Sequence, residues 1–301
     1  MSVRLAINPI TWSNDDMPSL GGDTPLQTCL AEARQAGFEG IELGNKFPRE
    51  PQALRAELDA FGLTLASGWY SARLLERSAE AEIAAVQPHL ELLHALGAPV
   101  MVFCETTGCV HGDRDAPLSR RPVLGAGDWR RFCARLNRVA EHLAGQGVPM
   151  AYHHHMGTVV ETEAEVDRLM ADTDEHVGLL LDTGHLAYAG GDPVAVAERH
   201  GRRINHLHTK DLRADVVAAM QARDSSFLDA VLAGAFTVPG DGSLDFRAVL
   251  EALRAWGYAG WIVVEAEQDP ARAHPLTYAC LGHDTLSRLV AETGIGRPPG
   301  A

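Results

Sequence analysis

The chain has 301 residues, of which 46% are hydrophobic and 22% charged, a composition typical of one large globular domain or two small ones. Forty acidic and 26 basic residues give a net charge of −14, which opposes binding to nucleic acids and to anionic membranes. No run approaches the roughly 18 apolar residues that a membrane helix needs, and we expect no signal peptide.

Short apolar runs alternate with longer stretches of helical periodicity along the chain. The expected strands are residues 4–10, 40–44, 63–69, 99–105, 148–154, 177–183, 204–210 and 261–267. Helical spacing of apolar residues is found in residues 24–37, 128–147, 161–173 and 245–257. In the first of these, Thr24 is the expected N-cap, Pro25 takes the first helical position and Gly37 ends the helix.

Eight strands alternating with about eight helices predict an α/β fold, a parallel (β/α)₈ or TIM barrel. An open doubly wound sheet is the alternative, but the segment NPITWSNDD after the first strand lacks the glycine-rich phosphate fingerprint of that fold. No linker-like segment divides the chain, so we expect one domain over residues 1–301. Loops at about 106–125 and 211–242 follow strands, which places them on the catalytic face of a barrel.

Acidic and imidazole side chains stand at the ends of the last four predicted strands. They are His153, His155, Asp182, His185, His206, His208, Glu265 and Glu267. Because side chains alternate along a strand, His153 and His155 share one face and His154 points the other way. Imidazoles and carboxylates from adjacent strands form a ligand set for Mn²⁺, Co²⁺, Zn²⁺ or Fe²⁺. Taken singly, a strand-end carboxylate can instead cap the next helix, and the deeper His206 is expected to lie behind the site.

Lysine is used at only two positions, Lys46 and Lys210, among 26 basic residues. Both follow predicted strands on the catalytic face. A compact ammonium group serves roles that the planar guanidinium group of arginine does not. We therefore expect both lysines to bind substrate hydroxyls or to act as the catalytic acid.

Other candidates for the substrate pocket follow the first and fourth strands. Asn14 and Asp15 are suited to hydrogen-bonding a polyol, although capping of the first helix explains them equally well. Trp12 either walls the pocket or packs in the core. Glu105 ends the fourth strand and is a further candidate.

Longer motifs resemble the xylose-isomerase-like barrels, which include sugar isomerases, ketose epimerases and endonuclease IV. The segments YHHHMGT, LLLDTGHLAY, HLHTKDLR, FTVPGDG and VVEAEQDPA are most similar to the myo-inosose-2 dehydratases of inositol catabolism. The resemblance runs from residue 8 to residue 271. DTGH alone would indicate only the superfamily.

The resemblance implies a divalent metal, Mn²⁺ or Co²⁺, held by His153, Asp182, His208 and Glu265. Members of the superfamily usually have a glutamate where this chain has His153, so a two-base epimerase mechanism is in doubt and elimination is favoured. From their positions we expect the catalytic residues to be Glu265, Glu267, His185, Lys46 and Lys210, with His155 and Glu105 as further candidates for the acid or base. We expect His155, Asn14, Asp15, Glu105 and Trp12 to bind the substrate.

The implied reaction is that of a hydro-lyase, which removes water from scyllo-inosose (2-keto-myo-inositol) to give a trihydroxycyclohexane-1,2-dione. A base takes the proton next to the ketone, a divalent cation stabilises the enolate, and an acid protonates the departing hydroxyl. Which residue is base and which is acid stays open. The dehydratase family also implies a response to glutathione, for which the sequence has no visible site.

Two other functions remain as alternatives. A ketose 3-epimerase or sugar isomerase would use the same metal-binding barrel without loss of water. A non-catalytic polyol-binding protein would bind the same compounds without turnover. An endonuclease IV-like enzyme would need a basic surface, which the net charge of −14 opposes.

The expected partner is a small cyclic polyol ketone, with neither nucleic acid nor membrane. Five scattered cysteines without C-x-x-C spacing are typical of a reduced, cytoplasmic protein. We also expect a homo-oligomer, a dimer or tetramer, because barrels of this kind often associate through exposed helix faces.

Overall fold

Within residues 2–296, which the computed structural model describes, eight parallel strands close into a barrel in the order β1-β2-β3-β4-β5-β6-β7-β10. The strands are β1 (Arg4–Ile7), β2 (Gly40–Leu43), β3 (Thr64–Ala72), β4 (Met101–Glu105), β5 (Met150–His153), β6 (Val177–Asp182), β7 (Ile204–Thr209) and β10 (Trp261–Val264). Each overlaps one of the predicted strands, and the last pairs with the first. The predicted TIM barrel is therefore confirmed.

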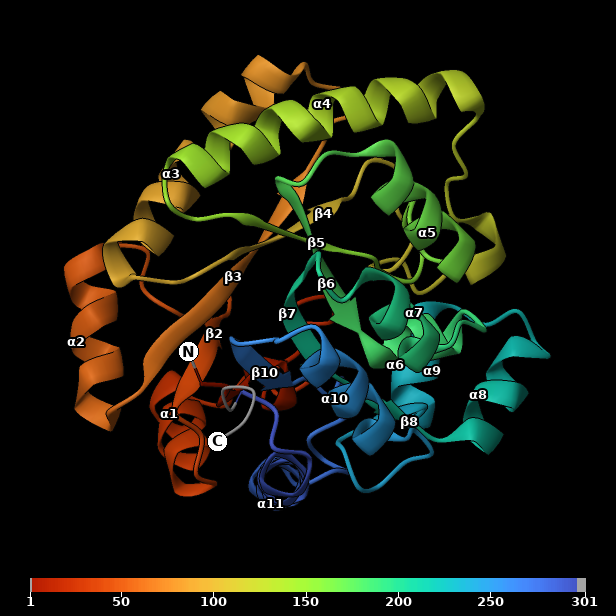
Figure 1. The fold of residues 1–301 in the computed structure, drawn as a ribbon. Helices are drawn as coiled ribbons and strands as arrows, with labels where there is room; N and C mark the ends of the chain where they lie inside the picture. Colours follow the sequence, from red (N-terminus) through yellow and green to blue (C-terminus); the bar gives the residue numbers. More distant parts are fainter. Residues whose placement is uncertain (1, 297–301) are drawn as a thin grey trace.

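Helices surround the barrel on the outside (Figure 1). They are α1 (Leu26–Gln35), α2 (Pro51–Phe61), α3 (Ala79–Leu96), α4 (Ala126–Gly145), α5 (Glu163–Asp172), α6 (Thr183–Tyr188), α7 (Pro193–His200), α8 (Ala214–Gln221), α9 (Phe227–Ala233), α10 (Phe246–Ala255) and α11 (Pro275–Thr293). The four predicted helical stretches correspond to α1, α4, α5 and α10. Two short 3₁₀ turns, η1 (Pro9–Thr11) and η2 (Leu118–Arg120), lie in loops after strands.

The predicted start of α1 is wrong by one residue. Pro25 has an extended ψ of 148° and is itself the cap, without a side-chain hydrogen bond, so the helix begins at Leu26. Thr24 instead offers its carbonyl oxygen to the Lys46 ammonium group. The predicted stop is right, because Gly37 has a φ of +105° that ends the helix.

Strands β5, β6 and β10 each contribute side chains to the interior of the barrel at two successive levels. Ala151, Leu180 and Val263 are fully buried and belong to two small apolar clusters of barrel-strand residues. Two residues further along the same strands come His153, Asp182 and Glu265, and period-two alternation sends these to the same interior. The ionisable layer therefore rests on an apolar layer at the carboxyl end of the strands, where barrel enzymes have their active sites.

The two predicted face loops contact one another. The segment 211–242 holds α8, α9 and the antiparallel pair β8 (Asp211–Leu212) and β9 (Phe236–Thr237). The loop 106–125 holds η2, and the Leu118 amide donates to the Ser225 carbonyl oxygen at 3.3 Å. Phe227 and Phe236 belong to a separate apolar cluster in this region.

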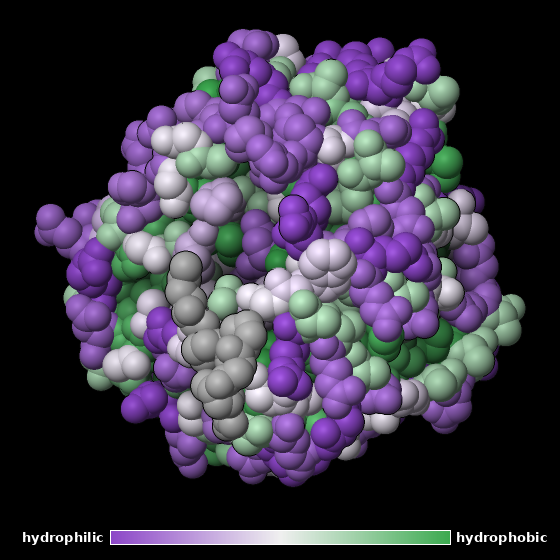
Figure 2. Space-filling model, in the orientation of Figure 1, coloured by the Kyte–Doolittle hydropathy of each residue, from purple (hydrophilic) through white to green (hydrophobic). Residues whose placement is uncertain are grey.

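The surface fits an acidic chain with its apolar side chains turned inward. Figure 2 shows a largely hydrophilic face on which apolar residues form scattered patches. No helix within residues 2–296 is both long enough and apolar enough to cross a membrane.

Gly178 allows close approach of the three strands that carry His153, Asp182 and His208. It pairs with Ala151 across β5 and β6, and a Cβ atom there would lie 2.2 Å from Asn205 Nδ2 and 2.5 Å from the Met150 carbonyl oxygen. These two groups are hydrogen-bonded to one another at 2.9 Å. A side chain at this position would therefore push apart β5 and β7 below the ionisable layer.

We predict that Gly178→Ala lowers the free energy of unfolding by about 1–3 kcal/mol, the usual cost of overpacking a core. The matched control is Gly127→Ala in the first turn of α4, where a Cβ meets nothing within 4 Å. The control should stay within about 1 kcal/mol of the wild type. Urea unfolding of both variants measures this, and equal midpoints for the two would contradict the account.

Candidate metal centre and substrate pocket

Four predicted ligands converge at the carboxyl end of the barrel. His153 ends β5, Asp182 ends β6, His208 lies near the end of β7, and Glu265 follows β10. Each offers a nitrogen or oxygen atom within 4.8 Å of those of the others, and all four are buried. Asp182 and His208 are direct neighbours in the β6–β7 ladder. The chain thus assembles two imidazoles and two carboxylates, a donor set suited to a divalent cation.

Asp182 Oδ2 is the atom around which this cluster is arranged. Asp182 Oδ1 caps α6 by accepting from the His185 amide at 2.8 Å, but Oδ2 is buried without a hydrogen-bond partner. His153 Nε2 lies 3.7 Å away and His208 Nδ1 3.6 Å away, too far for strong hydrogen bonds. A buried, unpartnered carboxylate oxygen between two imidazole nitrogens fits a cation, which would bind all three atoms.

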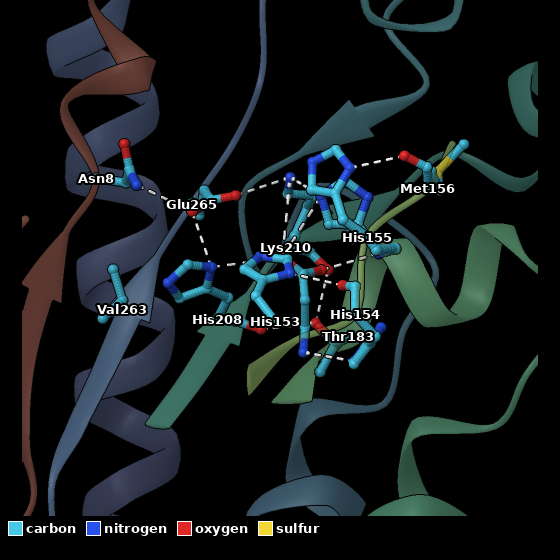
Figure 3. A network of polar contacts seen from close by, with 12 residues as sticks. Asn8, His153, His154, His155, Met156, Thr183, His208, Lys210, Val263 and Glu265 are labelled. Carbon is cyan, nitrogen blue, oxygen red and sulfur yellow. Dashed lines mark hydrogen bonds and ion pairs between the residues drawn. The ribbon is translucent and has the colours of Figure 1, made fainter. Parts of the chain in front are cut away.

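Hydrogen bonds on the far side of each ring orient the two histidines. His153 Nδ1 donates to the His154 carbonyl oxygen at 2.6 Å (Figure 3). The lone pair on His153 Nε2 therefore faces Asp182. His208 Nε2 lies 3.1 Å from Glu42 Oε1, so its Nδ1 faces Asp182 and Glu265. Metal-binding histidines are held in this way by a carbonyl or carboxylate on their other nitrogen.

The charge around the two rings favours a cation between them. Burial lowers the pKa of His153 to about 3, so this ring is neutral and able to donate a lone pair. Burial also acts to lower the pKa of His208, but Glu265 and Glu42 outweigh it and hold that pKa well above its usual value. The carboxylates therefore attract positive charge to His208 Nδ1, and a divalent cation would displace the proton there.

Glu42 on β2 orders the base of the cluster, although it is not among the residues predicted from the sequence. It accepts from His206 Nε2 at 2.8 Å and from His208 Nε2 at 3.1 Å. Asn8 Nδ2 bridges Glu42 Oε2 at 2.7 Å and Glu265 Oε2 at 3.0 Å. His206 is buried behind the cluster, as the sequence predicted. The available signal was a lone carboxylate within the apolar strand GIEL.

A second cluster adjoins the first and contains His155, His185, Glu267 and Lys210. Lys210 Nζ lies 2.8 Å from His185 Nε2 and 2.9 Å from Glu265 Oε1, and it donates to Glu267 Oε1. Burial acts to lower the pKa of Lys210, but Glu265, Glu267 and Asp182 outweigh it and raise that pKa. Lys210 is thus a buried ammonium ion between carboxylates of both clusters.

The three adjacent histidines have three different environments. His153 belongs to the first cluster, whereas His155 belongs to the second, with its Nδ1 donating to the Met156 carbonyl oxygen at 2.8 Å. His154 Nε2 accepts from the Asp182 backbone amide at 3.2 Å, away from both clusters. Because β5 ends at His153, the loop that follows and not strand alternation sets the direction of His155.

A cavity of about 220 Å³ opens beside the two clusters. It is lined by Asn8, Ile10, Asp15, Asp16, Leu43, Asn45, Arg49, Trp69, Ser71, His155, Glu265 and Glu267. Asp15, His155, Glu265 and Glu267 are among the predicted site residues. Trp69 packs edge-on against the rings of His153 and His155 and forms one wall.

The structure does not bring Lys46 to the cavity lining. Its ammonium group donates to the carbonyl oxygens of Gly21 at 3.0 Å, Gly22 at 2.9 Å and Thr24 at 2.5 Å. These three acceptors hold the loop before α1 against the loop after β2. A direct role of Lys46 in proton transfer stays a prediction.

Trp12 and Glu105 also lie outside the cavity lining. Trp12 is buried in the main apolar core, and its Nε1 donates to Glu32 Oε2 at 2.6 Å. Glu105 accepts from the backbone amides of Leu74 and Thr107, which ties together two loops. Their predicted substrate contacts remain predictions.

Asn14 belongs to the turn that positions Asp15 and Asp16 at the cavity. Its Oδ1 accepts from the backbone amides of Asp16 at 2.8 Å and Met17 at 2.7 Å, while its Nδ2 is buried without a partner. Burial raises the pKa of Asp15, whose Oδ2 accepts from the Asn45 amide.

The chain is similar to one protein family and to several known proteins over most of its length. The family described as "Xylose isomerase-like TIM barrel" matches residues 30–281. The rhizopine catabolism protein MocC of Rhizobium meliloti is 56% identical over 294 residues, covering 98% of this chain and 90% of that protein. An inosose dehydratase of Geobacillus thermodenitrificans is 46% identical over 279 residues, covering 92% of this chain and 94% of that protein.

A solved structure of the IOLI protein with a bound zinc atom is similar in fold. Its TM-score is 0.69 at 16% sequence identity, and the match covers 96% of this chain and 99% of that one. At this identity the likeness shows the barrel fold alone.

We predict that Glu42→Gln weakens Mn²⁺ binding by about 10–100-fold, because the neutral amide orients His208 less strongly than the carboxylate does. Calorimetric titration of the metal-free protein measures the affinity. Glu39→Gln is the matched control, since Glu39 is an exposed carboxylate that contacts Arg4 at the start of the barrel. Equal affinity of Glu42→Gln and the control would show that Glu42 does not organise the centre.

Proposed function

This chain belongs to the xylose isomerase-like TIM-barrel family, and we propose that it eliminates water from scyllo-inosose to give a trihydroxycyclohexane-1,2-dione. One observation carries the proposal: a buried cluster of two imidazoles and two carboxylates borders a cavity of about 220 Å³ lined by further proton-transfer groups. The similarity to inosose dehydratases over most of the chain supports the choice of reaction.

We propose Mn²⁺ or Co²⁺ as the metal, held by His153, Asp182, His208 and Glu265. Imidazole combined with carboxylate suits borderline divalent ions, and the cluster contains no thiolate that would favour structural zinc. When bound, such an ion supplies positive charge beside the substrate ketone, which makes the neighbouring C–H proton more acidic.

We assign the role of base to His155. Its Nδ1 donates to the Met156 carbonyl oxygen, so Nε2 holds the free lone pair of a ring that lines the cavity. Burial and the neighbouring imidazole of His111 lower the pKa of His155 well below its usual value, so Nε2 is unprotonated, although the same shift makes this ring a weaker base. In the proposed step His155 Nε2 takes the proton from the carbon next to the ketone.

Glu267 is the proposed acid for the departing hydroxyl. Burial raises the pKa of Glu267 to about 8, and its Oε2 is buried without a partner while Oε1 accepts from Lys210. A proton on Oε2 passes to the β-hydroxyl, which leaves as water as the C–O bond breaks. The enol that results tautomerises to the dione, so no electron acceptor is required.

Polar groups around the cavity suit a polyol. Asp15, Asp16, Asn45 and Arg49 line its mouth and offer acceptors and donors to ring hydroxyls. Trp69 provides an apolar wall for the C–H face of a ring. The ketose 3-epimerase alternative is less well supported, because His153 takes the position of a second carboxylate that could exchange protons with the substrate.

Three further expectations accompany this proposal. We propose a cytoplasmic location and a homo-oligomeric assembly, both carried over from the sequence. A response to glutathione rests on the family resemblance alone. A small cyclic polyol ketone is the proposed partner of the cavity.

We predict that scyllo-inosose incubated with the protein and Mn²⁺ loses the mass of one water, and that chelator abolishes the loss. Mass spectrometry of the product in deuterated and ordinary water measures this. His155→Gln should lower turnover by at least about 100-fold, since general-base catalysis contributes about 10²–10⁴-fold. His176→Gln, at an exposed turn, is the control and should retain activity.

Each other outcome selects a different function. Unchanged mass with deuterium entering the sugar would replace the dehydratase with an epimerase or isomerase. Binding of the sugar with neither change would leave a polyol-binding protein.

A further inference from the structure

The residues around Lys210 restrict the conformation of its side chain more than a proton donor at a cavity requires. Its side chain is completely buried, and a Cβ on Gly184 would lie 2.5 Å from Lys210 Cγ, so the chain has glycine where the lysine stem passes. Thr183 Oγ1 donates to the Lys210 carbonyl oxygen at 2.7 Å. The ammonium nitrogen lies 5.3 Å from the centre of the Phe236 ring. One rotamer of Lys210 is therefore selected by its surroundings.

The ammonium group of Lys210 sits within a second set of metal-type ligands. His155, His185 and Glu267 each offer a donor atom within 4.8 Å of the others, and all three are buried. Among residues 2–296, His185 Nδ1 and Glu267 Oε2 have no hydrogen-bond partner. Lys210 Nζ contacts His185 Nε2 and Glu267 Oε1, where a cation bound by these residues would have to sit.

We propose that the Lys210 ammonium group takes the place of a second metal ion and limits this centre to one divalent cation. The inference rests on the proposed metal centre but not on the proposed substrate. Lys210 also contacts Glu265 Oε1 at 2.9 Å and lies 3.8 Å from Asp182 Oδ2, both ligands of the first site. An ion in the second set would share those carboxylates with the first, as in two-metal sites with ions about 3.5–4 Å apart.

Charge explains why the ammonium group and a second ion exclude one another. Four carboxyl groups, those of Glu42, Asp182, Glu265 and Glu267, are buried in the two clusters, and Glu267 holds a proton in its proposed role as acid. One divalent ion and one ammonium group balance the charge of the three ionised carboxylates. A second divalent ion would have to displace Lys210 from its three carboxyl partners into a packed, apolar surrounding, which is strongly unfavourable.

The choice of lysine over arginine fits the same role. The chain has only two lysines among 26 basic residues, and the other one holds a loop through backbone carbonyls. An ammonium group is a compact point charge of roughly the size of a bound ion, whereas guanidinium is a wide planar fork. With Lys210 in place, His155 and Glu267 stay free of metal and available for proton transfer.

The test is the number of Mn²⁺ ions per chain, by elemental analysis after dialysis and by electron paramagnetic resonance. We expect one ion per chain in the wild type, with an uncoupled mononuclear spectrum. Lys210→Met keeps the length of the side chain but removes the charge and should bind two ions with a spin-coupled spectrum. Lys46→Met makes the same change at the other lysine, whose ammonium group contacts loop carbonyl oxygens outside both clusters, and is the control that should bind one. Adding His185→Ala to Lys210→Met should return the count to one.

Two ions in the wild type, or one uncoupled ion in a folded Lys210→Met variant, would overturn the inference. If Lys210→Met does not fold, the wild type is measured in excess Mn²⁺. A single uncoupled ion then supports the inference about Lys210, and a spin-coupled pair overturns it. The dehydration assay on the wild type is independent of this count. Absence of water loss with the expected ion counts would therefore reject the substrate and leave the role of Lys210 standing.

Discussion

The structure depends on the burial of four carboxylates at one end of the barrel. Glu42, Asp182, Glu265 and Glu267 are each at most 5% exposed. Isolated charges in such surroundings are very unfavourable, so positive charge must accompany them. Glu267 holds a proton in its proposed role as acid, and Lys210 balances one of the three remaining negative charges. The unpartnered oxygen of Asp182 between imidazole nitrogens indicates where a divalent cation balances the other two. The same excess of negative charge that requires a cation also makes the site able to bind one.

Small residues and an apolar layer allow this cluster to exist. Gly178 lets β5, β6 and β7 approach closely beneath it, and Gly184 makes room for the stem of Lys210. Ala151, Leu180 and Val263 fill the barrel below, which excludes water from one side. Above, the turn that carries Asp15 and the wall of Trp69 leave one cavity for substrate access. The fold thus buries the charged groups among apolar residues and opens them toward the cavity.

Regular periodicity made the barrel and the strand-end cluster predictable. All eight strands were found because alternation and apolar runs are local signals, and parallel strands bring their carboxyl ends together. Glu42 was missed because its hydrogen bonds to β7 are long-range and leave no local pattern. Lys46 was expected near the substrate because lysine is rare in this chain and Lys46 follows a strand, and Trp12 was left open between the pocket and the core. Loop side chains have no periodic pattern, so only the folded structure shows which groups they meet.

The most direct measurement is the position of the metal in crystals grown with Co²⁺, from anomalous scattering at the cobalt edge. We expect one peak per chain within about 2.0–2.2 Å of His153 Nε2, Asp182 Oδ2 and His208 Nδ1, with Glu265 completing the site. The ammonium group of Lys210 should remain beside Glu267. An anomalous peak between His155, His185 and Glu267 would contradict the central claim. Well-ordered crystals grown with Co²⁺ that show no peak at Asp182 would also contradict it.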